Sequence, residues 1–217
     1  MTGSVRTHRL VLQAEALAKR WMTGYRHGRP GVDLRRAWEH PADLVTLLAE
    51  RPGEFSEAGQ VKAMAIAWLH DVIEDGRKED GSRVAADDLR TLVIEHGNQE
   101  HEPYLDHSVV DGVIQLTHVE GTSKISYYES LKDVDYISKL VKCVDRICNL
   151  REGMNVFSPL RWNRYVLETQ KYILPLAKDL REETAEWLTE NLLAAIALRP
   201  TTGSLVCRSL LYGIFKP

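Results

Sequence analysis

The chain has 217 residues, of which 44% are hydrophobic and 27% charged, a composition typical of a globular domain and not of a disordered chain. Its formal net charge of -3 gives it no general attraction to nucleic acid or to anionic membranes. No apolar run approaches the ~20 residues that span a bilayer, the N-terminus lacks a signal-peptide pattern, and the three cysteines form no CxxC pair. We therefore expect a cytoplasmic protein with reduced thiols and without nucleic-acid or membrane partners.

The spacing of apolar residues predicts helices along the whole chain and no convincing strand. Residues 8–26 have the 3-4-7 spacing of an amphipathic helix, and Pro41 is well placed at the start of a helix over residues 40–50. Ser56 is a candidate cap for the next helix, which is expected to continue to Asp75. A helix that begins at Ser158-Pro159 is expected to bend or break at Pro175. The other expected helices cover residues 87–96, 104–119, 126–132, 133–151 and 181–198.

These elements predict an all-α fold, a single helical bundle of about nine or ten helices formed by residues 1–198. Residues 199–217 form a tail that is apolar enough to pack on this domain or on a partner subunit. In the second case the protein would be a homo-oligomer.

An almost unbroken apolar run, residues 63–69, ends abruptly in His70, Asp71, Glu74 and Asp75. A helix that is apolar on every side belongs in the interior, where an uncompensated carboxylate costs on the order of several kcal/mol. In one continuous helix the four polar side chains fall within an arc of roughly 140°, so all could face one cleft. The simpler alternative is a helix end that carries polar residues by chance.

A bound metal ion would compensate these carboxylates. His40, at a helix start, and Asp145, in a later helix, join His70 and Asp71 as candidate ligands. Two imidazoles and two carboxylates without a thiolate suit Mn²⁺, with Fe²⁺, Zn²⁺ or Mg²⁺ as alternatives. Such an ion could polarise a phosphate oxygen or lower the pKa of a bound water molecule.

This H…HD…D arrangement resembles that of HD-domain metal phosphohydrolases. The flanking residues are similar to the hydrolase domain of RelA/SpoT-type alarmone enzymes and their small stand-alone relatives. The matching segments are His40-Pro41, AWLHDVIED at residues 67–75, KLVKCVDRICNLR at residues 139–151 and ETQKYILPLA at residues 168–177. They occur in the family's order and cover roughly residues 14–180. The resemblance implies that residues 1–198 form an HD-type domain.

The resemblance also implies a reaction, the metal-dependent hydrolysis of the 3′-pyrophosphate of (p)ppGpp or (p)ppApp, which releases pyrophosphate and a nucleoside 5′-phosphate. Mn²⁺ is the implied cofactor and a small nucleotide the implied substrate. Glu74 and Asp75 match the family's pair that orients or deprotonates the attacking water. The implied metal ligands are His40, His70, Asp71 and Asp145.

The implied substrate-binding residues are Asn149 in the nucleoside pocket, with Arg146, Lys142 and Arg36 as candidates for contacts with phosphate or base. Arg146 could instead be structural, as a buried arginine often is. Arg36 is one of four arginines that could match the family's basic segment, the others being Arg26, Arg29 and Arg35.

Two positions depart from the family pattern, Ala37 where a tyrosine is common and Gly76 where a threonine is usual. Two other functions remain open. One is an HD phosphohydrolase that acts on another nucleotide, such as a dNTP or a cyclic dinucleotide. The other is a non-catalytic nucleotide-binding or immunity module, which the presence of both Glu74 and Asp75 argues against.

Overall fold

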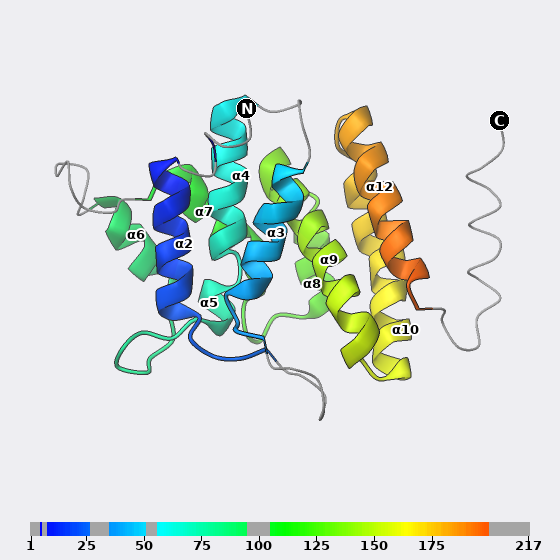
Figure 1. Cartoon of the computed structure of the whole chain (residues 1–217), viewed down its shortest axis with the longest axis horizontal. Helices are drawn as coiled ribbons and strands as arrows, with labels where there is room; N and C mark the ends of the chain where they lie inside the picture. The colour runs from blue at the N-terminus through cyan, green and yellow to red at the C-terminus, as the bar shows by residue number, and fades with distance from the viewer. Residues whose placement is uncertain (1–4, 6–7, 27–34, 51–55, 95–104, 200–217) are drawn as a thin grey trace.

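The structure is a computed structural model that describes residues 5, 8–26, 35–50, 56–94 and 105–199. Throughout these ranges the fold is helical and contains no β-strand (Figure 1). The extended pairings in these ranges are two isolated β-bridges, one between Tyr25 and Arg36 and one between Arg77 and Arg83. The predicted all-α fold is confirmed.

Taking α10, η1 and α11 as one continuous helix, the described ranges hold nine helices and the single turn α5, in agreement with the expected nine or ten. Their bounds are α2 (Arg9–Trp21), α3 (Glu39–Ala49), α4 (Glu57–Leu69), α5 (Val72–Asp75), α6 (Ala86–Ile94), α7 (His107–Leu116), α8 (Lys124–Ser130), α9 (Tyr136–Val156), α10 (Pro159–Glu168), the π-helix η1 (Thr169–Ile173), α11 (Leu174–Lys178) and α12 (Glu182–Ala197).

Helix α4 is the centre of the bundle. It packs against α2, α3, α7 and α9 (Figure 1). All residues from Ala63 to Leu69 are buried. This confirms that the apolar run lies in the interior. Helix α9 in turn packs against α11 and α12, so it joins the two halves of the bundle. The C-terminal end of α4 and the middle of α9 are thereby held side by side.

Side-chain caps fix where these helices begin. Ser56 Oγ accepts a hydrogen bond from Gly59 N at 3.2 Å at the start of α4. Ser158 Oγ accepts one from Arg161 N, with Pro159 in the first turn of α10. Both helix starts were predicted from the sequence, and both are confirmed.

The prediction that one helix continues from α4 to Asp75 is wrong. Helix α4 ends at Leu69, and α5 begins at Val72 after a break at His70 and Asp71. His70 Nδ1 lies 2.8 Å from the Ala67 carbonyl oxygen, the acceptor that the Asp71 N–H would use in a continuing helix. The two ligand candidates therefore occupy a junction and not one regular helical face.

The helix that begins at Pro159 is not broken at Pro175. It changes to the π-helix η1 over Thr169–Ile173 and continues as α11, with Pro175 in the first turn of α11. Proline has no N–H to donate to the carbonyl of Lys171, so the regular α-helical hydrogen bond is unavailable at this point.

The start of the tail is attached to the bundle. Arg199 Nη1 donates hydrogen bonds to the carbonyl oxygens of Met154 and Phe157, and Trp162 Nε1 donates to the Arg199 carbonyl. The rest of the tail, residues 200–217, and Arg29 lie outside the described residues. Among the described helices, none combines the length and apolarity required to cross a membrane.

Candidate metal centre and adjoining pocket

The four predicted ligands come together from three separate segments. His40 lies in the first turn of α3, His70 and Asp71 at the junction of α4 and α5, and Asp145 in the middle of α9. His40 Nε2 is 3.1 Å from Asp145 Oδ1, and His70 Nε2 is 3.1 Å from Asp71 Oδ1 and 3.6 Å from Asp145 Oδ1. The Asp145 carboxylate therefore contacts both imidazoles.

Three of these side chains form a group that could hold a metal ion. His40, His70 and Asp71 each offer one ligand atom, and these atoms all lie within 4.8 Å of one another. Asp145 is outside this group, although it contacts both of its histidines. Both imidazoles and the Asp145 carboxylate are buried, and Asp71 is half-buried.

The donor set fits a divalent cation, and His70 gives the clearest reason. Its Nδ1 must carry a proton, because the Ala67 carbonyl can only accept a hydrogen bond. Its Nε2 is buried and has no hydrogen-bond partner in the described part of the chain. A neutral imidazole would direct this lone pair at the oxygens of Asp71 and Asp145. A positive charge between them, either a proton or a metal ion, removes that repulsion.

The electrostatics of the centre show the same need for positive charge. Burial lowers the pKa of His70, but the charge of Asp71 and the contact with Asp145 outweigh it and raise this pKa to about 10. Burial raises the pKa of the Asp71 carboxyl, but the positive charge of His70 outweighs burial, so this pKa lies below its usual value. For Asp145, burial is outweighed by the Lys142 ammonium, which holds the pKa well below its usual range. Both carboxylates are therefore charged at neutral pH.

Lys142, predicted to bind substrate, lies at the edge of the metal centre. Its Nζ donates a hydrogen bond to Asp145 Oδ2 at 2.9 Å and lies 5.4 Å from the centre of the Tyr127 ring. Its ammonium group therefore compensates one oxygen of Asp145, while the other faces the two imidazoles.

Glu74 and Asp75 occupy the short turn α5, next to the metal centre. Burial raises the pKa of both carboxyls, and the charge of Asp71 raises both pKa values further. For Glu74, a hydrogen bond from the backbone partly opposes this rise. Glu74 Oε1 accepts this bond from His118 N at 2.7 Å. A carboxylate with a raised pKa is a better proton acceptor, as a general base requires.

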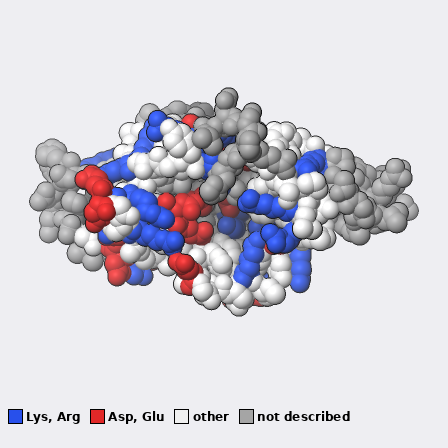
Figure 2. Space-filling model, turned by 90° about the horizontal axis from the view of Figure 1, so that it is seen from below, with Lys and Arg blue, Asp and Glu red and all other residues white. Residues whose placement is uncertain are grey.

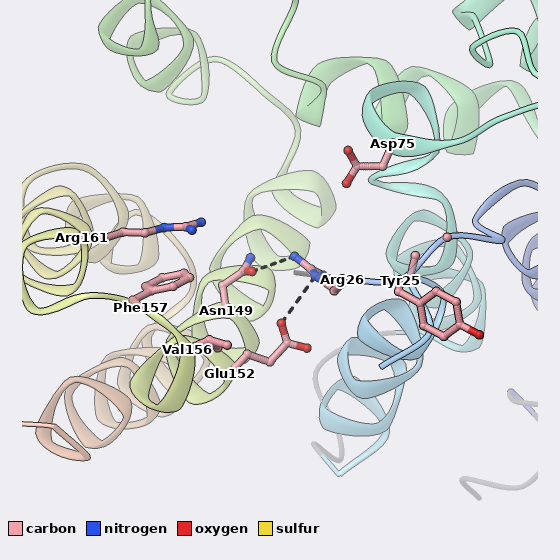
Figure 3. Close-up of a pocket in the computed structure, with 10 residues that line it drawn as sticks. Tyr25, Arg26, Asp75, Asn149, Glu152, Val156, Phe157 and Arg161 are labelled. Atoms are coloured by element: carbon pink, nitrogen blue, oxygen red, sulfur yellow. Dashed lines mark hydrogen bonds and ion pairs between the residues drawn. The ribbon is translucent and has the colours of Figure 1, made fainter. Parts of the chain in front are cut away.

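A pocket of about 510 Å³ adjoins the centre (Figure 3). Its walls come from the segment before α3, from α5 and from the end of α9 with the start of α10. In Figure 2, acidic and basic side chains crowd around a central hollow on the face seen from below. The lining residues are Gly24, Tyr25, Arg26, Ala37, Asp75, Asn149, Glu152, Val156, Phe157 and Arg161.

Asn149 connects the pocket to the metal centre. Its Nδ2 donates a hydrogen bond to Asp145 Oδ1, and its Oδ1 accepts one from Arg26 Nη2 at 3.1 Å. Arg26 also lies 3.7 Å from Asp71 Oδ2 and 3.6 Å from Glu152 Oε2, and its Nη1 has no hydrogen-bond partner among the described residues. Of the three described arginines among the four candidates, Arg26, Arg35 and Arg36, Arg26 is the one that lines this pocket.

Two predicted substrate-binding residues, Arg36 and Arg146, do not line this pocket. Arg36 is exposed and packs over the ring of Tyr25 at 5.1 Å. Arg146 is buried, donates a hydrogen bond to the Tyr128 hydroxyl at 2.6 Å and lies 3.9 Å from the ring centre of Tyr165. The structural alternative considered for Arg146 accounts for these contacts.

Sequence reasoning missed Glu152. It follows Asp145 by seven residues and Asn149 by three, so all three lie along one side of α9. That spacing could have identified it. Burial raises the pKa of its carboxyl, but the contact with His40 and the charge of Arg26 outweigh burial and lower this pKa.

Gly76 directly follows α5 and is buried. A Cβ atom there would lie 2.3 Å from the Val72 carbonyl oxygen and 3.1 Å from Cγ2 of Val84. We expect Gly76→Thr to lower the free energy of unfolding by about 1–3 kcal/mol, because the backbone of α5 must move. Urea denaturation checks this against Gly24→Thr, where a Cβ would meet nothing within 4 Å. Equal stability of the two variants would contradict the expectation.

Comparisons with known proteins add no further assignment. None of the models of known protein families matches this chain, and no curated protein matches its sequence. The residues of the centre and the pocket are therefore the basis for inferring a function.

Proposed function

We propose that this chain is a metal-dependent phosphohydrolase of the HD-domain type, which hydrolyses the 3′-pyrophosphate of (p)ppGpp or (p)ppApp. The observation that carries the proposal is the buried Nε2 of His70, which makes no hydrogen bond in the described part of the chain and faces two charged carboxylates, with a second imidazole beside it. The resemblance of the sequence motifs to RelA/SpoT-type hydrolase domains supplies the substrate class.

The residues of the centre suggest how the reaction would proceed. His40, His70, Asp71 and Asp145 would hold Mn²⁺, which when bound supplies the charge that polarises a phosphate oxygen and lowers the pKa of water. Asp75, which lines the pocket beside the centre, would orient the attacking water or take its proton, with Glu74 as its neighbour on α5.

The pocket supports a nucleotide as substrate. Its volume of about 510 Å³ lies within the usual range of small-molecule sites, which is roughly 300–1,000 Å³. Arg26 offers a buried donor for an acceptor atom of the substrate, and Asn149 fixes the position of Arg26 relative to Asp145. We also propose a cytosolic location, because Cys143 and Cys148 are buried free thiols that suit a reducing compartment.

The test is turnover by the purified chain. With Mn²⁺ present, we expect pyrophosphate and a nucleoside 5′-phosphate to form from ppGpp or ppApp, and we expect EDTA to abolish the reaction. Mn²⁺ should also raise the melting temperature, since a ligand that binds only the folded state stabilises it. His70→Ala should lose both the turnover and the rise in melting temperature with Mn²⁺.

Metal binding without turnover of either alarmone would reject this substrate class. A panel of dNTPs, nucleoside monophosphates and cyclic dinucleotides then distinguishes a different HD phosphohydrolase from a binding or immunity module, because only the former releases a product.

A further inference from the structure

The imidazole of His40 lies between two carboxylates of the same helix. Its ring is fully buried, with Nε2 3.1 Å from Asp145 Oδ1 and Nδ1 3.6 Å from Glu152 Oε1. Asp145 and Glu152 are two turns apart on α9, so the helix presents one carboxylate to each ring nitrogen. Nδ1 makes no hydrogen bond among the described residues, and the carboxylate of Glu152 is the acidic group beside it.

Glu152 is itself held in place by two arginines. Its Oε1 accepts a hydrogen bond from Arg35 Nη1 at 3.1 Å, and its Oε2 lies 3.6 Å from Arg26 Nε (Figure 3). The glutamate side chain is only 20% exposed. The two guanidinium groups keep it charged and restrict its position, so that its carboxylate remains beside His40.

The role of Glu152 depends on which ring nitrogen carries the proton. Without a metal, the Nε2–H of His40 can donate to Asp145 Oδ1. When a cation takes the lone pair of Nε2, the proton of the neutral ring must be on Nδ1, inside the protein. Glu152 is then the acidic group beside that buried N–H. For His70 the Ala67 carbonyl has the equivalent place.

We propose that Glu152 is a positioning residue that fixes His40 with its proton on Nδ1 and its Nε2 lone pair toward the metal centre. This inference rests on the proposed metal site. Glu152 contacts His40 at Nδ1, whereas Asp145 contacts it at Nε2, the nitrogen that faces the metal centre. It therefore acts through His40 and not as a ligand.

A simpler role for Glu152 would be to anchor Arg35. The chain offers a matched control, because Asp43 Oδ2 accepts a hydrogen bond from the same Arg35 Nη1 at 2.8 Å, and Asp43 forms no hydrogen bond or ion pair with His40 in the described part of the chain. Asp43→Asn removes an ion pair of the same arginine. Only a variant of Glu152 also removes the carboxylate beside Nδ1.

The experiment measures the affinity for Mn²⁺ by calorimetric titration of the full chain and its variants. We expect Glu152→Ala to weaken Mn²⁺ binding about 10- to 100-fold, the range usual for a lost outer-shell partner of a metal-bound histidine. Glu152→Gln keeps an acceptor oxygen and should lose less. Asp43→Asn should bind Mn²⁺ like the unchanged chain. Circular dichroism shows whether each variant is folded.

A second readout is the state of the His40 ring. In the chain loaded with diamagnetic Zn²⁺, long-range ¹H–¹⁵N spectra should show His40 protonated at Nδ1, and Glu152→Gln should keep this state in the folded protein. Equal Mn²⁺ affinities for Glu152→Ala and Asp43→Asn, or a His40 ring protonated at Nε2 in the Zn²⁺ form, would overturn the inference.

These results are separable from a failure of the proposed function. Mn²⁺ binding that depends on Glu152, in a chain that turns over no nucleotide, supports the positioning role and rejects the phosphohydrolase. Absence of Mn²⁺ and Zn²⁺ binding to the unchanged chain overturns both.

Discussion

A variant that combines Glu74→Gln with Asp75→Asn is expected to bind Mn²⁺ normally and to release pyrophosphate about 10²- to 10⁴-fold more slowly, the usual effect of losing a general acid or base. Both substitutions keep the shape of the side chain and remove its ability to take a proton at neutral pH. The glutamine oxygen can still accept the hydrogen bond from His118 N, so α5 should remain attached to the end of α7.

The measurement is kcat at saturating Mn²⁺, together with the dissociation constant of Mn²⁺. Glu79→Gln is the matched control, because Glu79 is exposed, lies four residues beyond Asp75 and pairs with Arg20 on the surface. It should keep the full rate. A double variant that also keeps the full rate would show that neither carboxylate acts on the attacking water.

Most of the helical fold could be predicted because its signals are local. The apolar run from Ala63 to Leu69 indicated a buried helix, and Ser56 and Ser158 marked helix starts that the structure confirms. The break after α4 could not be predicted from helical periodicity. It involves the ring of His70 next to the Ala67 carbonyl, a contact between a side chain and the backbone that no apolar pattern records.

The candidate site likewise has parts that could be predicted from local motifs and parts that could not. The convergence of His40, His70, Asp71 and Asp145 was expected from short motifs. The wall of the pocket was not, since the hydrogen bond between Arg26 and Asn149 joins residues 123 positions apart. Such a contact depends on how α9 packs beside the segment before α3, and a single sequence carries no local signal for it.

The orientation of Arg146 could not be predicted from the sequence either. Its neighbours along the chain made it a candidate phosphate ligand, but its orientation is determined by aromatic residues of other helices. Tyr128 from α8 and Tyr165 from α10 surround its guanidinium group. Motif position alone therefore does not tell which side of α9 a long side chain faces.

Asp145→Asn is expected to destabilise the metal-free protein by about 3–5 kcal/mol, the usual effect of removing one member of a buried ion pair. The aspartate contacts Lys142, His40 and His70, and the variant leaves the half-buried Lys142 ammonium without its carboxylate partner. Such a loss is a large part of the roughly 5–15 kcal/mol that stabilises a domain. Urea denaturation in the presence of EDTA measures it, and Mn²⁺ should stabilise the variant less than the unchanged chain.

A second substitution, made in the Asp145→Asn chain, tests whether the unpaired charge causes this loss of stability. If the uncompensated Lys142 ammonium causes most of the loss, Lys142→Met in the Asp145→Asn background should recover part of the stability, because no unpaired charge then remains at that position. If the double variant is less stable than Asp145→Asn alone, the loss comes from the packing of α9 and not from charge. In that case the ion pair would not explain why a carboxylate occupies this buried position, and its contacts with the two imidazoles would be the remaining reason.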